Sequence, residues 1–208
     1  MSGEYRFGNI PDHYFLVPPR LVPKNGVEFA KRGFAKIARY DVGLVIDGVG
    51  FLRASLEKLS RELGTSDYIK FLGEVLRERL LPLMKRSEAV IVPSVPANGV
   101  IEATSLGVLE AMAMGVPVIA SAIGGIKEII VNDSTGFLTP PGEPAAILRA
   151  MMAALARDDS ARVAVAQNAL RRVRDRFGSE AWIRTIQSTY YDITGKPPAN
   201  IDTLSFPQ

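Results

Sequence analysis

The chain of 208 residues is long enough for one large or two small domains, and its 47% hydrophobic and 23% charged residues are typical of a globular domain. It has no cysteine, which excludes disulfides, thiolate metal sites and a cysteine nucleophile, and its one histidine, His13, leaves no His-rich metal site. The formal net charge of +3 is too small to indicate nucleic acid as a partner.

In chain order, short apolar runs alternate with amphipathic helical patterns. The runs that predict strands are residues 14–17, 43–46, 68–72, 89–92, 117–121 and 136–138. The predicted helices between them are residues 27–40, 51–63, 76–86, 106–114 and 126–131, followed by 144–157, 160–177 and 180–193. Strand–helix alternation is typical of crossover units around a parallel sheet. The sequence therefore predicts the α/β class: a doubly wound, Rossmann-like parallel sheet of about six strands with C-terminal helices.

No linker divides the chain, so residues 13–194 are predicted to form one domain. Residues 1–12 are expected to be a leader or interdomain linker, and residues 195–208 an irregular tail. The start lacks the apolar core of a signal peptide, and the longest uncharged stretch, residues 111–126, is too short to span a bilayer. The expected location is the cytoplasm, including a peripheral position at the inner face of the membrane.

In an open doubly wound sheet, ligands bind beyond the carboxyl ends of the strands, where the strand order reverses. If the order is 3-2-1-4-5-6, this switch point lies between the first and fourth strands. Arg20, Lys24 and Asn25 follow the first strand, and residues 94–110 follow the fourth. The sequence thus predicts a crevice lined by cations, carboxylates and one helix N-terminus.

The segment after the fourth strand contains two glutamates, Glu102 and Glu110, around the start of a helix that Thr104 or Ser105 can cap. The free N–H groups and dipole of a helix N-terminus favour an anion such as phosphate. If the helix is considered alone, the favoured interpretation is that Glu110 is a surface glutamate and Ser105 only caps the helix. The surrounding motif reverses that preference.

This segment resembles the donor-binding domain of GT-B-fold retaining glycosyltransferases of the family 4 type. That family has two glutamates at this spacing, followed by a run like Ala111-Met112-Ala113-Met114-Gly115-Val116-Pro117. Further segments also fit the pattern: residues 124–130, 135–138 and 141–142 downstream, and residues 20–26, 71–75 and 93–94 upstream. The resemblance covers about residues 13 to 193.

The resemblance implies a role for each matching position. Arg20 and a nearby lysine would neutralise the leaving nucleotide diphosphate in place of a metal ion. Glu110 would bind the ribose hydroxyls and Glu102 the donor sugar. Arg20 and Glu102 are the implied catalytic residues; the implied donor-binding set is Arg20, Lys24, Asn25, Gly73, Glu74, Glu102, Ala103, Thr104, Ser105, Leu106 and Glu110. No metal and no cofactor beyond the nucleotide diphosphate sugar is implied.

Two departures from the family pattern concern the phosphate site and the domain content. Asn25 stands where the family usually has a lysine, which leaves Lys24 as the candidate replacement. A GT-B enzyme has two such domains, so the implied partners are an N-terminal domain, in cis or as a separate chain, and a sugar or lipid-linked acceptor. The chain alone is therefore expected to be inactive. His13 precedes the first strand and is not expected to be catalytic.

Three other functions remain open at this point. The first is a sugar-nucleotide-binding or regulatory module without transferase activity, and the second is a GT-B-like sugar-nucleotide epimerase. The third is a dinucleotide-dependent oxidoreductase, suggested only by the glycine pattern in residues 47–50. A cluster of arginines near the C-terminus is expected to form a solvated helix face: Arg171, Arg172, Arg174 and Arg176. The aromatic residues of the last predicted helix are expected either to lie in the core or to contact the missing domain: Trp182, Tyr190 and Tyr191.

Overall fold

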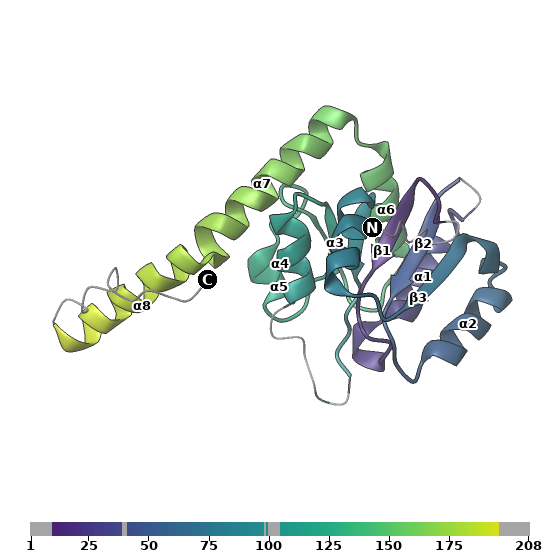
Figure 1. Cartoon of the computed structure of the whole chain (residues 1–208), viewed down its shortest axis with the longest axis horizontal. Coiled ribbons are helices and arrows are strands. Elements are labelled where there is room, and N and C mark those ends of the chain that lie inside the picture. The colour runs from purple at the N-terminus through teal and green to yellow at the C-terminus, as the bar shows by residue number, and fades with distance from the viewer. Residues whose placement is uncertain (1–9, 39–40, 98, 100–104, 196–208) are drawn as a thin grey trace, which may run out of the picture.

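The computed structural model describes residues 10–38, 41–97, 99 and 105–195, which form a six-stranded sheet with helices on both faces (Figure 1). All neighbouring strands are parallel, and their order is β3-β2-β1-β4-β5-β6. The strands are β1 (Tyr14–Val17), β2 (Gly43–Asp47), β3 (Ile69–Gly73), β4 (Ala89–Val92), β5 (Val118–Ser121) and β6 (Phe137–Thr139). The predicted doubly wound sheet is confirmed, with the switch point between β1 and β4.

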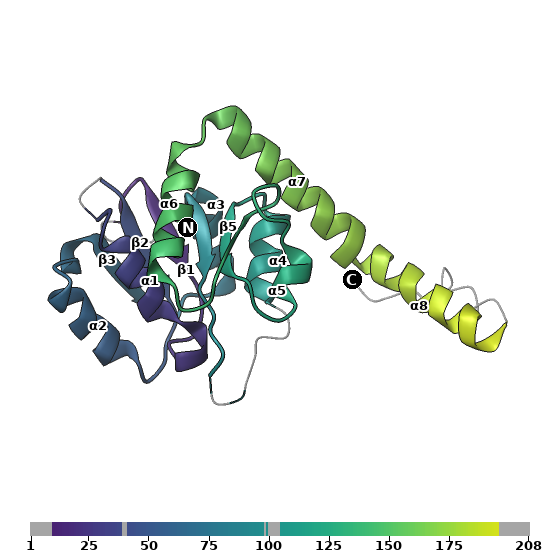
Figure 2. The same ribbon diagram turned by 180° about the vertical axis from the view of Figure 1, so that it is seen from behind.

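The continuous apolar strands are buried because alternate side chains enter two different cores. Phe15 and Val17 of β1 pack toward α1 (Val27–Phe34), α2 (Arg53–Glu62) and α6 (Pro144–Ala156). Tyr14 and Leu16 face the opposite core, which is covered by α3 (Arg77–Arg86), α4 (Leu106–Ala113) and α5 (Ile126–Ile129). Figures 1 and 2 show these two groups of helices on the two sides of the sheet. The carboxyl edge of the sheet lies between these two groups of helices.

Short turns complete the first half of the fold and shorten one predicted helix. One-turn 3-10 segments lie at Pro23–Asn25 and Ser66–Tyr68. Helix α1 ends at Phe34, earlier than predicted, because the chain continues in tighter turns in which Ile37 N donates to Phe34 O. Residues 39–40, the end of the predicted helix, lie outside the described residues.

Helices α7 (Asp159–Phe177) and α8 (Ser179–Thr194) lead away from the sheet (Figures 1 and 2). Arg172 of α7 donates to the carbonyls of Glu128 and Ile129 at 2.6 Å, so this arginine binds the end of α5 instead of lying on a wholly solvated face. On α8 the exposure is 65% for Trp182, 47% for Tyr190 and 54% for Tyr191. The prediction that these aromatic residues are core is therefore wrong.

Candidate functional site

The two segments predicted to flank the crevice meet at the switch point. The segment after β4 hydrogen-bonds to the turn after β1, since Val95 N donates to Lys24 O at 2.8 Å. Gly26 ends that turn with φ 58°, and a Cβ there would lie 2.0 Å from the carbonyl oxygen of Pro93. Only glycine combines this left-handed conformation with so close an approach. The backbone contacts therefore fix the turn after β1 against the β4 segment.

The turn itself presents Arg20 on the surface and holds its shape through Asn25. The Arg20 side chain is exposed, whereas Asn25 is buried and its Nδ2 donates to Arg20 O at 2.7 Å. Asn25, expected among the donor-binding residues, thus has its side-chain nitrogen engaged within the turn. Lys24 is partly buried in the same turn and carries the carbonyl that receives Val95 N.

Helix α4 begins at the carboxyl edge of the sheet, as predicted, and Ser105 is its N-cap. Ser105 Oγ accepts from Val108 N at 3.4 Å. The next residue, Leu106, is 73% exposed, so the first turn of the helix opens to solvent. The first backbone amides of a helix lack acceptors within the helix, which is the basis of anion binding there. Glu102, Ala103 and Thr104, which also belong to the predicted site, lie outside the described residues.

Glu110 faces a partner that the sequence did not indicate. Arg77 Nη1, at the start of α3, donates to Glu110 Oε1, although these residues lie 33 positions apart. The Glu110 side chain is 27% exposed and the Arg77 side chain 68% exposed. The glutamate is thus held by an accessible cation and keeps an open side toward solvent. No spacing rule links the two positions, because the pairing depends on how α3 and α4 pack on the same face of the sheet.

The turn after β3 carries the two remaining predicted residues. Gly73 adopts φ 81°, and Glu74 is exposed. Beneath the turn lies the buried carboxylate of Asp47, whose Oδ1 accepts from Val75 N at 3.1 Å. Burial raises the pKa of Asp47 to about 6; the hydrogen bond from Val75 lowers it and the nearby Glu74 charge raises it further. The sequence marked Asp47 only as part of a glycine pattern, and its contact with Val75 is not visible in that pattern.

Titratable groups also gather at the opposite, amino edge of the sheet. Glu88, which is buried, receives a hydrogen bond from Arg162 Nη2 of α7 and pairs with His13 Nδ1 at 2.7 Å. The hydrogen bond to Glu88 and its charge raise the pKa of His13. This places His13 at the edge of the sheet opposite the switch point.

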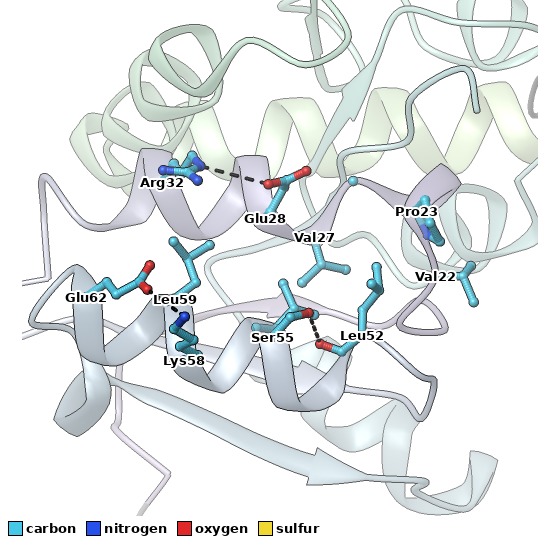
Figure 3. A pocket seen from close by; sticks show the side chains of 12 residues that line it. Val22, Pro23, Val27, Glu28, Arg32, Leu52, Ser55, Lys58, Leu59 and Glu62 are labelled. Atoms are coloured by element: carbon cyan, nitrogen blue, oxygen red, sulfur yellow. Dashed lines mark hydrogen bonds and ion pairs between the residues drawn. The ribbon is translucent and has the colours of Figure 1, made fainter. Parts of the chain in front are cut away.

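A surface groove between α1 and α2 borders the turn after β1, of which Val22, Pro23 and Gly26 line it, but the expected donor-binding residues are not among its lining residues (Figure 3). It encloses about 390 Å³, with Val27, Leu52 and Leu59 among its lining residues. Ion pairs within each helix lie at its rim: Arg32 with Glu28 at 4.0 Å and Lys58 with Glu62 at 3.7 Å. Because its charges are paired with one another, the groove offers no charged group dedicated to a ligand.

Two negative findings concern other kinds of site. Within residues 10–38, 41–97, 99 and 105–195, no three His, Asp or Glu side chains gather as a metal ion would require. In the same part of the chain, no helix combines the length and hydropathy needed to cross a membrane.

Comparison with known proteins matches this architecture to a family. Residues 8–172 match the model of the glycosyl transferases group 1 family. The chain belongs to this family. It is 38% identical over 129 residues to an uncharacterized glycosyltransferase of Methanocaldococcus jannaschii, covering 62% of this chain and 32% of that protein.

Solved structures agree with the family assignment. Sucrose-phosphate synthase from Thermosynechococcus elongatus superposes with a TM-score of 0.77 and 28% identity, over 89% of this chain and 47% of that chain. HepE of Anabaena in complex with UDP-glucose superposes with a TM-score of 0.73 and 25% identity, over 86% of this chain and 48% of that chain. The chain thus corresponds to the C-terminal domain of a GT-B glycosyltransferase and spans less than half the length of these relatives.

Proposed function

We propose that this domain binds a nucleotide diphosphate sugar and serves as the donor half of a retaining glycosyltransferase. The observation that supports it most directly is the meeting of the Arg20 turn with the segment after β4 at the switch point. An exposed guanidinium on one side and the start of α4 on the other form a pair of anion-binding elements. The UDP-glucose complex of HepE, a relative of the same fold, agrees with this ligand class.

In this proposal the leaving diphosphate is stabilised by the protein alone. Arg20, assisted by Lys24, interacts with the phosphate oxygens on which negative charge develops, and the amides of Thr104, Ser105 and Leu106 bind the distal phosphate. Glu110 accepts from the ribose hydroxyls, and Glu102 contacts the hydroxyls of the donor sugar. Backbone groups near Gly73 and Glu74 meet the base. No divalent metal takes part, and the sugar is transferred with retention at the anomeric carbon.

The acceptor and the remaining active-site residues belong, in this proposal, to an N-terminal domain. Trp182, Tyr190 and Tyr191 on α8 present exposed aromatic surface that suits a contact with that domain. The acceptor is a sugar or a lipid-linked sugar, at a cytoplasmic location that includes the inner face of the membrane. The isolated chain is expected to bind its donor without transferring the sugar.

A thermal-shift panel of UDP, GDP, ADP and their sugar conjugates, each with and without EDTA, tests the proposal. A ligand that binds only the folded state at 100 times its Kd stabilises it by about 2.7 kcal/mol. We expect one base to raise the melting temperature clearly, and EDTA to leave that shift unchanged. A panel without any shift would refute donor binding, and a shift that requires magnesium would refute metal independence.

A further inference from the structure

The loop of residues 47–50 after β2 packs directly against the turn that carries Arg20. Leu21 N donates to Val49 O at 2.9 Å. A Cβ on Gly50 would lie 2.2 Å from the carbonyl oxygen of Leu21, so the two backbones touch. Packing against the chain itself therefore explains the glycine pattern that suggested a dinucleotide loop.

The same loop holds the turn after β3 through two hydrogen bonds. Gly48 N donates to Gly73 O at 2.6 Å, and Val75 N donates to Asp47 Oδ1 at 3.1 Å. The register between β2 and β3 shifts here, so that Asp47 lies opposite Gly73. Asp47 is 5% exposed, so its carboxylate lies beneath the turn and acts as an internal anchor.

The anchor also fixes the direction of a neighbouring backbone acceptor. In a trans peptide the C=O and the N–H point in opposite directions, and the described residues contain no cis peptide bond. Because Val75 N–H points to the buried Asp47, the carbonyl of Glu74 in the same peptide plane points away from it. Beside this peptide, a Cβ on Gly73 would have no heavy atom within 4 Å, which leaves room for a flat ligand.

Resting on the proposed function, we infer that Asp47 is a positioning residue for base recognition: it aims the Glu74 carbonyl at the edge of the nucleobase. A carbonyl accepts the imino N–H that uracil and guanine carry. The corresponding ring nitrogen of adenine is itself an acceptor, and the donor that adenine presents on that edge, its amino group, lies beside this position. Because the anchor holds the carbonyl in one direction, the site selects the ring N–H over the displaced amino group and so favours a uridine or guanosine diphosphate over adenosine diphosphate. Through the loop of residues 47–50, the same anchor sets the distance between the base turn and the Arg20 turn.

Calorimetry on the 208-residue chain with UDP, GDP, ADP and pyrophosphate tests this role. Asp47→Val removes the acceptor but keeps a similar volume and suits a strand end, and Asp47→Asn keeps an acceptor oxygen as the matched control. In the wild type we expect UDP or GDP to bind at least about tenfold more tightly than ADP, which corresponds to about 1.4 kcal/mol. In Asp47→Val this selectivity should fall to about threefold or less, with pyrophosphate affinity unchanged; Asp47→Asn should keep both.

Several outcomes separate this inference from the proposed function. If the wild type binds no nucleoside diphosphate, the proposed function fails and the inference falls with it. If the wild type binds but prefers ADP, or if Asp47→Val keeps the full base selectivity, only the role of Asp47 is refuted. An equal loss of pyrophosphate and nucleotide affinity would indicate a general structural role and would also refute it.

A measurement without any variant covers the case in which Asp47→Val does not fold. The Val75 amide should exchange with solvent deuterium at least about tenfold more slowly than an unprotected amide, because Asp47 accepts its hydrogen. Unprotected exchange at Val75 would overturn the anchoring role.

Discussion

Two carboxylates are buried to almost the same extent at opposite edges of the sheet, yet their partners differ. Glu88 at the amino edge is 6% exposed and binds two basic side chains, His13 and Arg162. Asp47 at the carboxyl edge is 5% exposed and accepts its hydrogen bond from a backbone N–H. At the amino edge the charges compensate one another, whereas at the carboxyl edge burial makes the charged form of Asp47 unfavourable.

The difference separates charged groups that bind one another within the fold from charged groups that stay accessible to the ligand proposed above. The cations of the amino edge are bound to Glu88, so they tie α7 and the start of β1 to β4. At the carboxyl edge, Arg20 is exposed and Glu110 keeps an open side. Unfavourable local electrostatics at one edge of an otherwise consistent fold is typical of functional sites.

The largest expected effect is on ligand affinity at the carboxyl edge. Arg20→Lys should lose most of the affinity for a nucleoside diphosphate, about 3 kcal/mol, because lysine cannot reproduce a bidentate contact to phosphate. Lys24→Ala should lose less. Arg162→Lys, at the amino edge, is the matched control and should bind normally in calorimetry. A larger loss for Lys24→Ala would mean that Lys24 is the principal phosphate contact.

Glu110→Ala should discriminate between ligands at the same edge. Loss of its charge-assisted hydrogen bonds to the ribose should weaken nucleoside diphosphate binding by about 2 kcal/mol. Pyrophosphate, which has no ribose, should bind as before or slightly better. Arg77→Gln, which removes the partner of Glu110 but keeps its carboxylate, is the control. Equal weakening of both ligands in Glu110→Ala would assign Glu110 to the structure of the site.

Glu88→Ala should change stability at the amino edge without changing binding. It removes the acceptor from Arg162 and His13, and we expect a loss of about 1.5 kcal/mol in the free energy of unfolding. Urea denaturation gives this value, and calorimetry with the best nucleotide should give the wild-type Kd. A change in nucleotide affinity would show that the two edges are coupled.

Asp47→Asn should change the free energy of unfolding in the direction opposite to Glu88→Ala: it should stabilise the domain above pH 6. Since burial raises the pKa of Asp47 from 3.8 to about 6, the folded state binds more protons than the unfolded state between these values. Stability therefore falls as the pH rises through this range, and the cost is fully present above pH 6. Asparagine removes the cost, so its melting temperature should exceed that of the wild type at pH 8 and approach it at pH 4. Destabilisation at pH 8 would mean that the carboxylate is needed in its charged form.

The sequence predicted most of the fold and which segments meet at the switch point, but not the contacts between them. The strands and their parallel arrangement followed from continuous apolar runs and crossover geometry, whereas the order 3-2-1-4-5-6 entered only as a condition that the structure then met. The glutamate motif indicated the segment that starts α4. The pairing of Arg77 with Glu110 and the contact of Val75 with Asp47 join residues about 30 positions apart. Such contacts depend on register and helix packing, which a local pattern does not encode. The aromatic residues of α8 were misassigned in part because the pattern of an apolar stripe does not show whether it packs within the same domain.

The smallest expected effect is on stability, from substitution of His13. It tests whether His13 helps to compensate the buried charge of Glu88 at the amino edge. The His13 side chain is 65% exposed, so solvent screens its interaction with Glu88. Since the hydrogen bond to Glu88 raises the pKa of His13, the pair stabilises the fold fully below the unfolded value of 6.5. This contribution is lost as the pH rises through the folded pKa. His13→Gln should therefore melt below the wild type at pH 5.5 and close to it at pH 9. In the Glu88→Ala background the same substitution should have a much smaller pH-dependent effect, because the group that favours the imidazolium most is absent and only the weaker influence of Asp41 and Asp12 remains. A difference that is constant with pH would assign His13 a packing role and leave Arg162 as the cation that compensates Glu88.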